Sequence, residues 1–237
     1  GGDTTSAWYE APTSRYRHGI MGDAIEAGTL VARAATGAEY RFRLPASEVF
    51  EDRYPRLADL DGDGTVEVIT IRSSSRAGAA VTIYGVEDER LVERATTEFI
   101  GSANRWLNIA GIAPYLGGPD LQIAYVTTPH IGGTLKLIGF EDGVLTRHGE
   151  AYGFSNHWIG SRELRLSATA RIDGALALAV PSANRAALRI MRFLPAGPEE
   201  IAAIDLPGRI DKAIGRTATG FVVGLTNGDV FTVEPGE

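Results

Sequence analysis

The sequence predicts an all-β fold, arranged as a five-bladed β-propeller. Apolar runs are short and rich in β-branched or aromatic residues, and Gly, Pro, Asn or Asp interrupt them about every 8–12 residues. Helical periodicity is nearly missing. The runs also come in pairs joined by polar turns, and these pairs repeat along the chain.

The repeat defines the expected blades. Inner strands are expected to begin near His18, Leu57, Ile109, Ser167 and Ala213, at spacings of 39, 52, 58 and 46 residues. These spacings bracket the roughly 40–50 residues of a propeller blade. The predicted blades cover residues 18–52, 57–101, 109–152, 167–207 and 213–235 of a single domain, 1–237.

The last repeat has only three strands, whereas a strand-like segment, residues 6–12, precedes the first full repeat. We expect this N-terminal segment to complete the last blade and close the ring, because closure removes the exposed edge of an open array. A β-sandwich, or two small β domains, is the alternative architecture.

Composition limits the classes of function. The chain of 237 residues is long enough for a substantial core, and its formal net charge of −7 argues against a general binder of nucleic acid or anionic membranes. It has no cysteine, which excludes disulfides and thiolate chemistry. No apolar run of 18 residues and no leader-like segment occur, so the expectation is a mature or never-targeted chain that does not insert into membranes.

A cluster of acidic residues lies in the stretch LADLDGDGTVEVITI, residues 57–71. Carboxylates at alternate positions repel one another unless a cation neutralises them, and Gly64 permits the sharp turn of a calcium loop. An EF-hand would also need Glu at the twelfth position, which is Thr70. The expected Ca²⁺ ligands are Asp59, Asp61, Asp63, the backbone carbonyl of Thr65, and Glu67.

The segment ADLDGDGTVEVITI, residues 58–71, resembles the FG-GAP or VCBS-type repeat of integrin-like propellers. The resemblance implies a Ca²⁺ loop between the first and second strands of a blade. Matching positions elsewhere lack the acids: the next repeat has Pro114, Leu116, Gly118 and Gln122, and the third keeps only Asp173. We therefore expect one structural calcium site; a solvated acidic turn without metal is the alternative.

Propeller geometry also predicts a ligand face, formed by the second-to-third strand loops and the connections between blades. These loops carry three of the four histidines, two of the three tryptophans and many arginines. Arg clamps carboxylates or phosphates, and Trp offers a stacking surface. The candidate ligand-binding residues are His18, Arg53, Arg72, Asn104, Arg105, Trp106, His130, Asn156, His157 and Arg162. Asp23 and Glu26 are expected on the opposite, calcium-loop face.

Each of these assignments has a structural alternative. The tryptophans could fill gaps between blades, and the arginines could pair with Asp52 or Glu163 at the rim. The three histidines His18, His130 and His157 could instead bind a transition metal.

The motifs favour a binding protein over an enzyme. The chain has no G-x-S-x-G elbow, no phosphate-binding glycine loop and no H-E-x-x-H. We therefore expect a calcium-stabilised propeller, periplasmic or secreted, that binds an anionic or polyhydroxyl small molecule, a glycan or a protein. A carbohydrate-active hydrolase, with His130 or His157 as acid or base and Glu163 assisting, is the second hypothesis. A protein-binding platform on the basic rim is the third.

Overall fold

A computed structural model describes residues 4–234, all in strands, turns and loops with no helix. Accordingly, no helix able to cross a membrane exists in residues 4–234. The chain forms two compact units. The first contains the residues up to Leu107 together with Phe140–Leu145, and the second contains Asn108–Gly139 and the chain from Thr146 onward.

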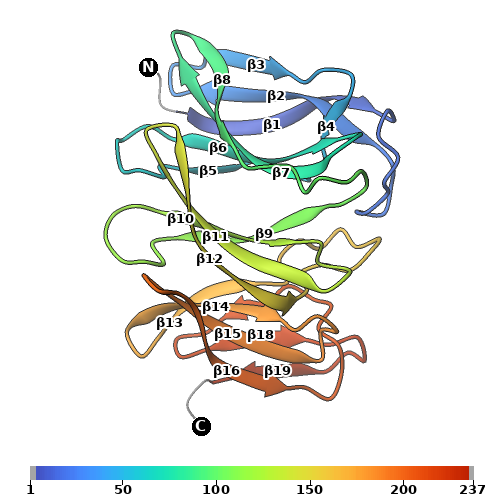
Figure 1. Cartoon of the computed structure of the whole chain (residues 1–237), viewed down its shortest axis with the longest axis vertical. Coiled ribbons are helices and arrows are strands. Elements are labelled where there is room, and N and C mark those ends of the chain that lie inside the picture. Colours follow the sequence, from blue (N-terminus) through green and yellow to red (C-terminus); the bar gives the residue numbers. More distant parts are fainter. Residues whose placement is uncertain (1–3, 235–237) are drawn as a thin grey trace. The chain divides into compact units, whose positions relative to one another are not determined.

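The first unit is built on one eight-stranded sheet (Figure 1). The strands run in the order β1-β2-β4-β6-β7-β8, with β3 paired to β2 and β5 paired to β6. Their bounds are β1 Thr4–Thr13, β2 Glu26–Ala34, β3 Glu39–Arg43, β4 Glu48–Phe50, β5 Arg56–Ala58, β6 Glu67–Ser74, β7 Gly78–Glu87 and β8 Arg90–Thr96. Its core packs side chains of β2, β4, β6 and β7 against one another, including Leu30, Phe50, Val68 and Tyr84.

The strand β1 corrects the predicted ring closure. It pairs antiparallel with β2 along its length, from Thr4 opposite Ala34 to Thr13 opposite Glu26. The segment 6–12 therefore belongs to the N-terminal sheet, and the C-terminal sheet holds three strands in the described part of the chain. The reason is local: β1 and β2 are consecutive strands of matching length, and adjacent strands pair most readily.

Three further sheets follow, each an antiparallel meander. The first has the order β12-β11-β10-β9, the second β13-β14-β15-β16 and the third β17-β18-β19. The bounds are β9 Leu107–Ala113, β10 Gln122–Thr127, β11 Gly133–Glu141, β12 Val144–Phe154, β13 Ala168–Ile172, β14 Ala175–Pro181, β15 Ala187–Leu194, β16 Gly197–Asp205, β17 Gly215–Arg216, β18 Phe221–Gly224 and β19 Val230–Val233. The predicted last strand extended to Pro235, which lies outside the described residues.

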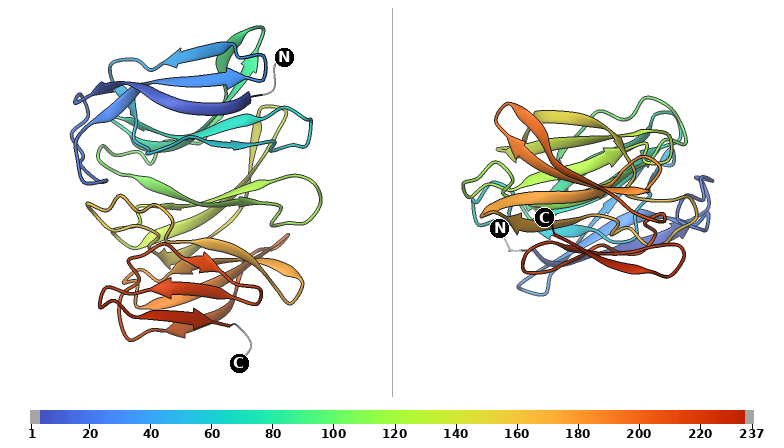
Figure 2. Two further views of the ribbon diagram at one scale, coloured as in Figure 1. Left: turned by 180° about the vertical axis from the view of Figure 1, so that it is seen from behind. Right: turned by 90° about the horizontal axis from the view of Figure 1, so that it is seen from below.

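Within the second unit the sheets pack face to face (Figure 2). One core joins β13–β15 to the last sheet through residues such as Ile190 and Phe221. A second core joins the other face of β14 and β15 to β10 and β11, through residues such as Leu178 and Leu137. Because strand side chains alternate between faces, a central meander can bury both faces in this way.

Candidate functional site

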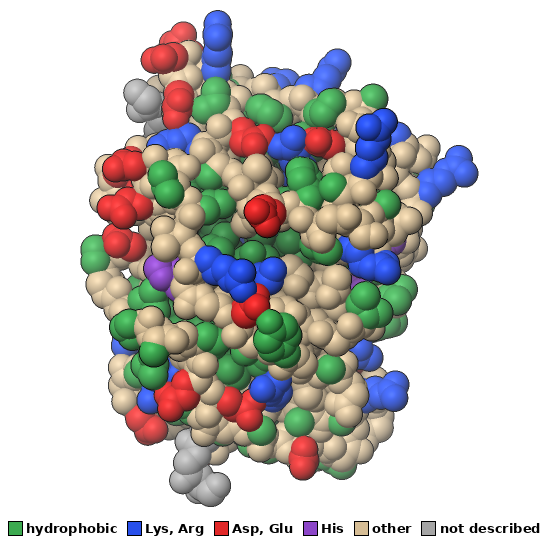
Figure 3. Space-filling view, in the orientation of Figure 1, with side chains coloured by type: hydrophobic (Ala, Val, Ile, Leu, Met, Phe, Trp, Pro, Cys, Tyr) green, Lys and Arg blue, Asp and Glu red, His purple; other side chains and the backbone are tan. Residues whose placement is uncertain are grey.

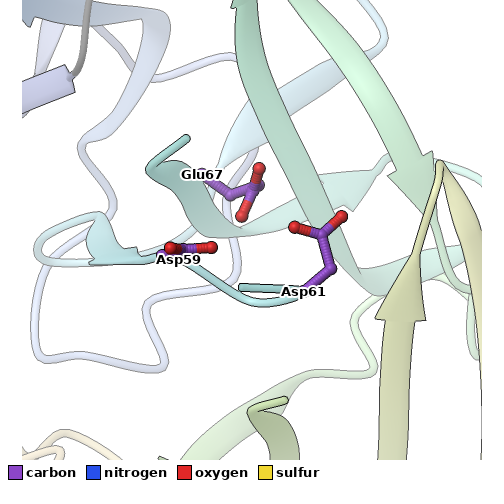
Figure 4. A group of neighbouring side chains, drawn as sticks. All are labelled: Asp59, Asp61 and Glu67. Carbon is purple, nitrogen blue, oxygen red and sulfur yellow. The ribbon is translucent and has the colours of Figure 1, made fainter. Parts of the chain in front are cut away.

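The acidic loop joins β5 to β6 and brings three carboxylates together. One oxygen from each of Asp59, Asp61 and Glu67 lies within 4.8 Å of the others. Figure 4 shows the three carboxylates turned toward a common space. Glu67 is placed by strand β6 and is fully buried, whereas the two aspartates lie on the half-buried loop.

Hydrogen bonds orient two of these side chains. The N–H of Gly64 donates to Asp59 Oδ2 at 3.0 Å, and the N–H of Leu60 donates to Glu67 Oε2 at 2.9 Å. The remaining oxygens, Asp59 Oδ1, Asp61 Oδ1 and Glu67 Oε1, are buried and have no hydrogen-bond partner within residues 4–234. Three buried, unpaired carboxylate oxygens in one place fit a hard cation such as Ca²⁺, which binds through oxygen.

The electrostatics of the loop agree with this fit. Burial, opposed by the hydrogen bond from Leu60 and aided by the charges of Asp61 and Asp63, raises the pKa of Glu67 to about 7. Asp63 differs from the sequence-based expectation: its Oδ1 accepts a hydrogen bond from the N–H of Thr65 at 2.6 Å, and its side chain is exposed. This hydrogen bond braces the turn, and the carboxylates that converge are those of Asp59, Asp61 and Glu67. The Thr65 carbonyl as a ligand stays a prediction.

In the first unit, His18 belongs to a buried polar group centred on Glu51. His18 Nδ1 lies 2.7 Å from Glu51 Oε1, and Ser73 Oγ donates to Glu51 Oε2 at 2.5 Å. Glu51 is completely buried, which raises its pKa, while the bonds from His18 and Ser73 oppose this rise. The group can hold a proton between an imidazole and a carboxylate.

Glu26 lies near the same group, although it was expected on the face of the calcium loop. Burial raises the pKa of Glu26 to about 9, and the nearby charge of Glu51 is the second cause. At neutral pH Glu26 is therefore a protonated carboxylic acid beside Glu51. The expectation treated GDAIEAG, residues 22–28, as the loop between the first and second strands of a blade, whereas Glu26 is the first residue of β2 and pairs with Thr13 of β1.

The other candidates of the first unit divide into buried and exposed residues. Trp106 is 2% exposed, and its Nε1–H donates to the backbone carbonyl of Glu51 at 2.9 Å, so its ring fills the core and offers no stacking surface. Arg72 donates to Glu48 at 2.5 Å and also pairs with Glu93. Exposed positions remain at Arg53, Asn104 and Arg105.

A close glycine contact positions the loop that carries Asn104 and Arg105. Gly78 has a φ of +76°, and a Cβ there would lie 2.4 Å from the Ser102 carbonyl oxygen and 2.7 Å from that of Arg105. The N–H of Ala79 donates to the Arg105 carbonyl at 2.8 Å. Only glycine allows the loop to approach β7 so closely.

In the second unit, His130 and His157 meet. His130 Nε2 lies 2.8 Å from His157 Nδ1, and His157 Nε2 lies 3.0 Å from the carbonyl oxygen of Ser161. The carbonyl requires Nε2 of His157 to carry the proton, so Nδ1 accepts from His130. His157 is fully buried, and this burial together with the charge of Arg185 lowers its pKa to about 4. Both ring nitrogens of His157 are therefore engaged in hydrogen bonds.

Asn156 is buried and holds a loop in place through backbone hydrogen bonds. Its Nδ2 donates to the Asn108 carbonyl at 3.2 Å, and Asn108 Nδ2 donates to the carbonyls of Asn156 and Leu164 at 3.1 and 2.9 Å. Both asparagines are fully buried. This reciprocal pair holds the 155–164 loop on β9, while Arg162 on the same loop is exposed.

The histidines are therefore distributed between the units: His18 bonds Glu51 in the first, and the His130–His157 pair lies in the second. Sequence reasoning assigned Glu26 to the other face, treated Asp52 as a rim charge and did not identify Glu51, although all three are buried. Asp52 accepts from Arg56 at 2.6 Å and from the hydroxyl of Tyr9 at 3.1 Å. The sequence offered one signal, the apolar Val49-Phe50 directly before the two acids.

No protein-family model matches the chain, and no curated protein matches it in sequence. Solved structures resemble it in fold. The rhamnogalacturonan lyase YesW has a TM-score of 0.55 and 14% identity, covering 98% of this chain and 44% of the lyase. The exotype rhamnogalacturonan lyase YesX has a TM-score of 0.46 and 14% identity, covering 100% of this chain and 53% of that protein. A protein from Lactobacillus plantarum has a TM-score of 0.46 and 16% identity, covering 89% of this chain and 67% of that protein.

The chain thus spans less than half the length of YesW. At 14% identity the likeness concerns the fold alone. Together with the consecutive antiparallel meanders, it identifies the chain as an all-β, β-propeller-like protein.

Proposed function

We propose that this chain is a calcium-stabilised propeller module that binds an anionic or polyhydroxyl ligand. The observation that carries the proposal is the set of three unpaired carboxylate oxygens of Asp59, Asp61 and Glu67. Removing those charges from water without a cation is unfavourable, so a bound cation would stabilise this conformation of the loop. The resemblance of residues 58–71 to an FG-GAP or VCBS-type loop supports calcium as that cation.

The proposal includes five blades. β4 pairs with both β2 and β6, so the eight-stranded sheet separates into β1–β3 and β5–β8 on either side of it. The three later sheets bring the number of groups to five. A module of this kind suits a periplasmic or secreted location, where calcium is abundant enough for a loop with few charged ligands.

Calorimetric titration with Ca²⁺ tests the metal. We expect one site per chain, and we expect Asp61→Asn to weaken it at least about tenfold because one of three charged ligands is lost. Arg33→Gln is a suitable control, since Arg33 is an exposed residue of the same unit that pairs with Glu39. Absence of Ca²⁺ binding to the wild-type protein would refute the proposal.

For the ligand, the exposed cationic positions are the relevant groups. Arg53 and Arg105 are exposed near the buried His18–Glu51 group in the first unit, and Arg162 is exposed in the second. On the face drawn in Figure 3, Lys and Arg side chains are interleaved with Asp and Glu, so the net negative charge is not a uniform field. Cationic loops can therefore receive an anion despite the charge of −7.

Binding of acidic oligosaccharides, followed by NMR, tests this part. We expect Arg53→Ala and Arg105→Ala to weaken binding several-fold, with Arg33→Ala as the matched exposed control. Equal binding by all three variants would show that these loops do not hold the ligand.

A second candidate, a carbohydrate-active hydrolase, is favoured by one observation. Glu26 is a protonated acid at neutral pH and lies near Glu51, which is bonded to His18. An acid and a base near one another are the groups that glycoside hydrolysis requires. Glu26→Gln removes the acid with little change in shape. Release of reducing ends from acidic polysaccharides by the wild-type protein, lost in Glu26→Gln, would support this candidate; no release by the wild-type protein would exclude it for those substrates.

A further inference from the structure

The second unit contains a cavity of about 340 Å³ that the proposed function does not use. It lies between the β9–β10 loop, the β13–β14 turn and the end of β15. His130 lies beyond the other end of β10, since β10 runs from Gln122 near the cavity to Thr127 before the His130 loop. The cavity and the histidine pair are therefore at opposite ends of the same strands.

Two cationic side chains, Arg171 and Arg192, line the cavity, and its lining contains no acidic residue. Arg171 Nη1 donates to the Gly174 carbonyl at 2.9 Å, which fixes the guanidinium beside the turn. Arg192 is half-buried, and its Nε is buried without a hydrogen-bond partner among the described residues. A buried guanidinium N–H without an acceptor indicates that an acceptor is missing from the site.

The remaining walls are mostly apolar. Leu116, Leu176, Phe193 and Leu194 contribute side chains, and Tyr115 packs edge-on to Phe193 with ring centroids 5.0 Å apart. The Tyr115 hydroxyl is bonded to Thr169 Oγ1 at 2.6 Å, so its ring has a fixed position. A preformed cavity with apolar walls and a few directed polar groups is the usual form of a small-molecule site.

We propose that this cavity binds a small carboxylate carried on an apolar ring or sugar ring. The carboxylate would accept from Arg192 and Arg171, because a planar guanidinium matches a carboxylate in shape and charge. The ring would lie against the Leu and Phe side chains. An inorganic anion such as phosphate would satisfy the arginines but leave the apolar walls without a partner.

Titrations with D-galacturonate and with benzoate, monitored by the amide signals of Gly117, Gly118 and Gly174, test the proposal. We expect saturable shifts for at least one of the two acids, and weaker or no shifts for D-galactose and benzyl alcohol. Binding of galacturonate alone would identify a sugar acid, binding of benzoate alone an aromatic acid, and either result supports the proposal.

Variants locate the site. Arg192→Gln and Arg171→Gln should each weaken binding about tenfold or more. Arg147→Gln is the matched control, because Arg147 is an exposed residue of the same unit, pairs with Glu150 and does not line the cavity. Ala175→Leu, which fills the cavity without changing its charge, should also reduce binding and guards against an arginine variant that fails to fold.

Three outcomes would overturn the proposal. The first is no saturable shift with either acid, and the second is equal binding of inorganic phosphate. The third is unchanged binding in both folded arginine variants. Arg105→Ala should leave binding to the cavity unchanged. The cavity proposal and the proposed ligand loops of the first unit can therefore fail independently of each other.

Discussion

Two hairpin loops at equivalent places in successive sheets are each held by a side chain that accepts a hydrogen bond from a backbone N–H of the loop, but the two side chains differ in chemistry. In the β5–β6 loop, Glu67 Oε2 accepts from the N–H of Leu60 at 2.9 Å. In the β9–β10 loop, Gln122 Oε1 accepts from the N–H of Leu116 at 3.0 Å. The second polar atom of each side chain differs. Gln122 Nε2 donates to the Asp120 carbonyl at 3.0 Å, whereas Glu67 Oε1 is buried without a hydrogen-bond partner among the described residues.

The comparison shows what the cation would contribute. The amide of Gln122 satisfies itself with backbone groups, so its loop closes without an ion. The carboxylate of Glu67 supplies the same brace but leaves one charged oxygen unpaired beside two aspartates. The two loops thus differ at the amide or carboxylate of this position and at the two neighbouring aspartates, which the β9–β10 loop replaces with Pro114 and Leu116.

Calcium should produce the largest difference between the two loops. At a free concentration about a hundredfold above the dissociation constant, Ca²⁺ should stabilise the wild-type protein by about 2.7 kcal/mol. The melting temperature should then rise by roughly 5–10 °C in a calorimetric scan. Glu67→Gln, which copies the amide of the other loop, should show little of this rise. An equal rise in both proteins would place the calcium effect elsewhere.

The second-largest effect is expected in the pH dependence of stability, which should differ between the metal-free wild-type protein and Glu67→Gln. The pKa of Glu67 is raised from 4.5 to about 7 in the folded chain, so the folded state keeps its proton where the unfolded state has lost it. The contribution of Glu67 to stability should therefore be fully present below about pH 4.5 and should be lost as pH rises through about 7, by roughly 1–3 kcal/mol. Urea unfolding in chelator measures the change. Because Glu26 also titrates, the difference between wild type and Glu67→Gln isolates this contribution.

The reverse substitution should cost less. Gln122→Glu keeps the bond from Leu116 but replaces the donor to the Asp120 carbonyl with an acceptor. We expect the free energy of unfolding in urea to fall by about 1–2 kcal/mol. The loss should not depend on calcium, because this loop has Pro114, Leu116 and Gly118 where the acidic loop has its aspartates. A calcium-dependent recovery of stability would contradict this account of the loop.

The smallest effect is expected at Asp63. Its carboxylate braces Thr65 and lies outside the convergent group, so Asp63→Asn should change calcium affinity by only about twofold to threefold. Asp61→Asn, a change of the same size and chemistry in the same loop, is the control and should weaken binding much more. Equal losses in calorimetric titration would return Asp63 to the ligand set.

The sequence predicted the strands well because they follow local rules. Alternating apolar residues and turn residues such as Asp173-Gly174, which adopts φ values of +51° and +79°, specify a hairpin within a few residues. The convergence of Asp59, Asp61 and Glu67 was also predictable, since these carboxylates are eight residues apart at most; calcium as their ligand stays a prediction.

Long-range pairing was not visible. The blade repeat alone does not distinguish a β1 that pairs with its neighbour β2 from one that completes the last sheet. The same limit applies to burial: Trp106, Glu51 and His157 have the composition of a ligand face but lie in the interior. The cavity beside Arg192 requires three separate segments, so no single stretch of sequence indicates it.

Strand β4, only three residues long, has a consequence for how the molecule opens. It is hydrogen-bonded to β2 on one edge and to β6 on the other, so loosening it exposes backbone amides of both neighbours at once. Slow amide exchange near Ala27 in β2 and near Arg72–Ser74 in β6 should therefore be lost together. The three-stranded β17–β19 group has no such shared strand in the described chain, and its amides can exchange through a smaller, separate fluctuation.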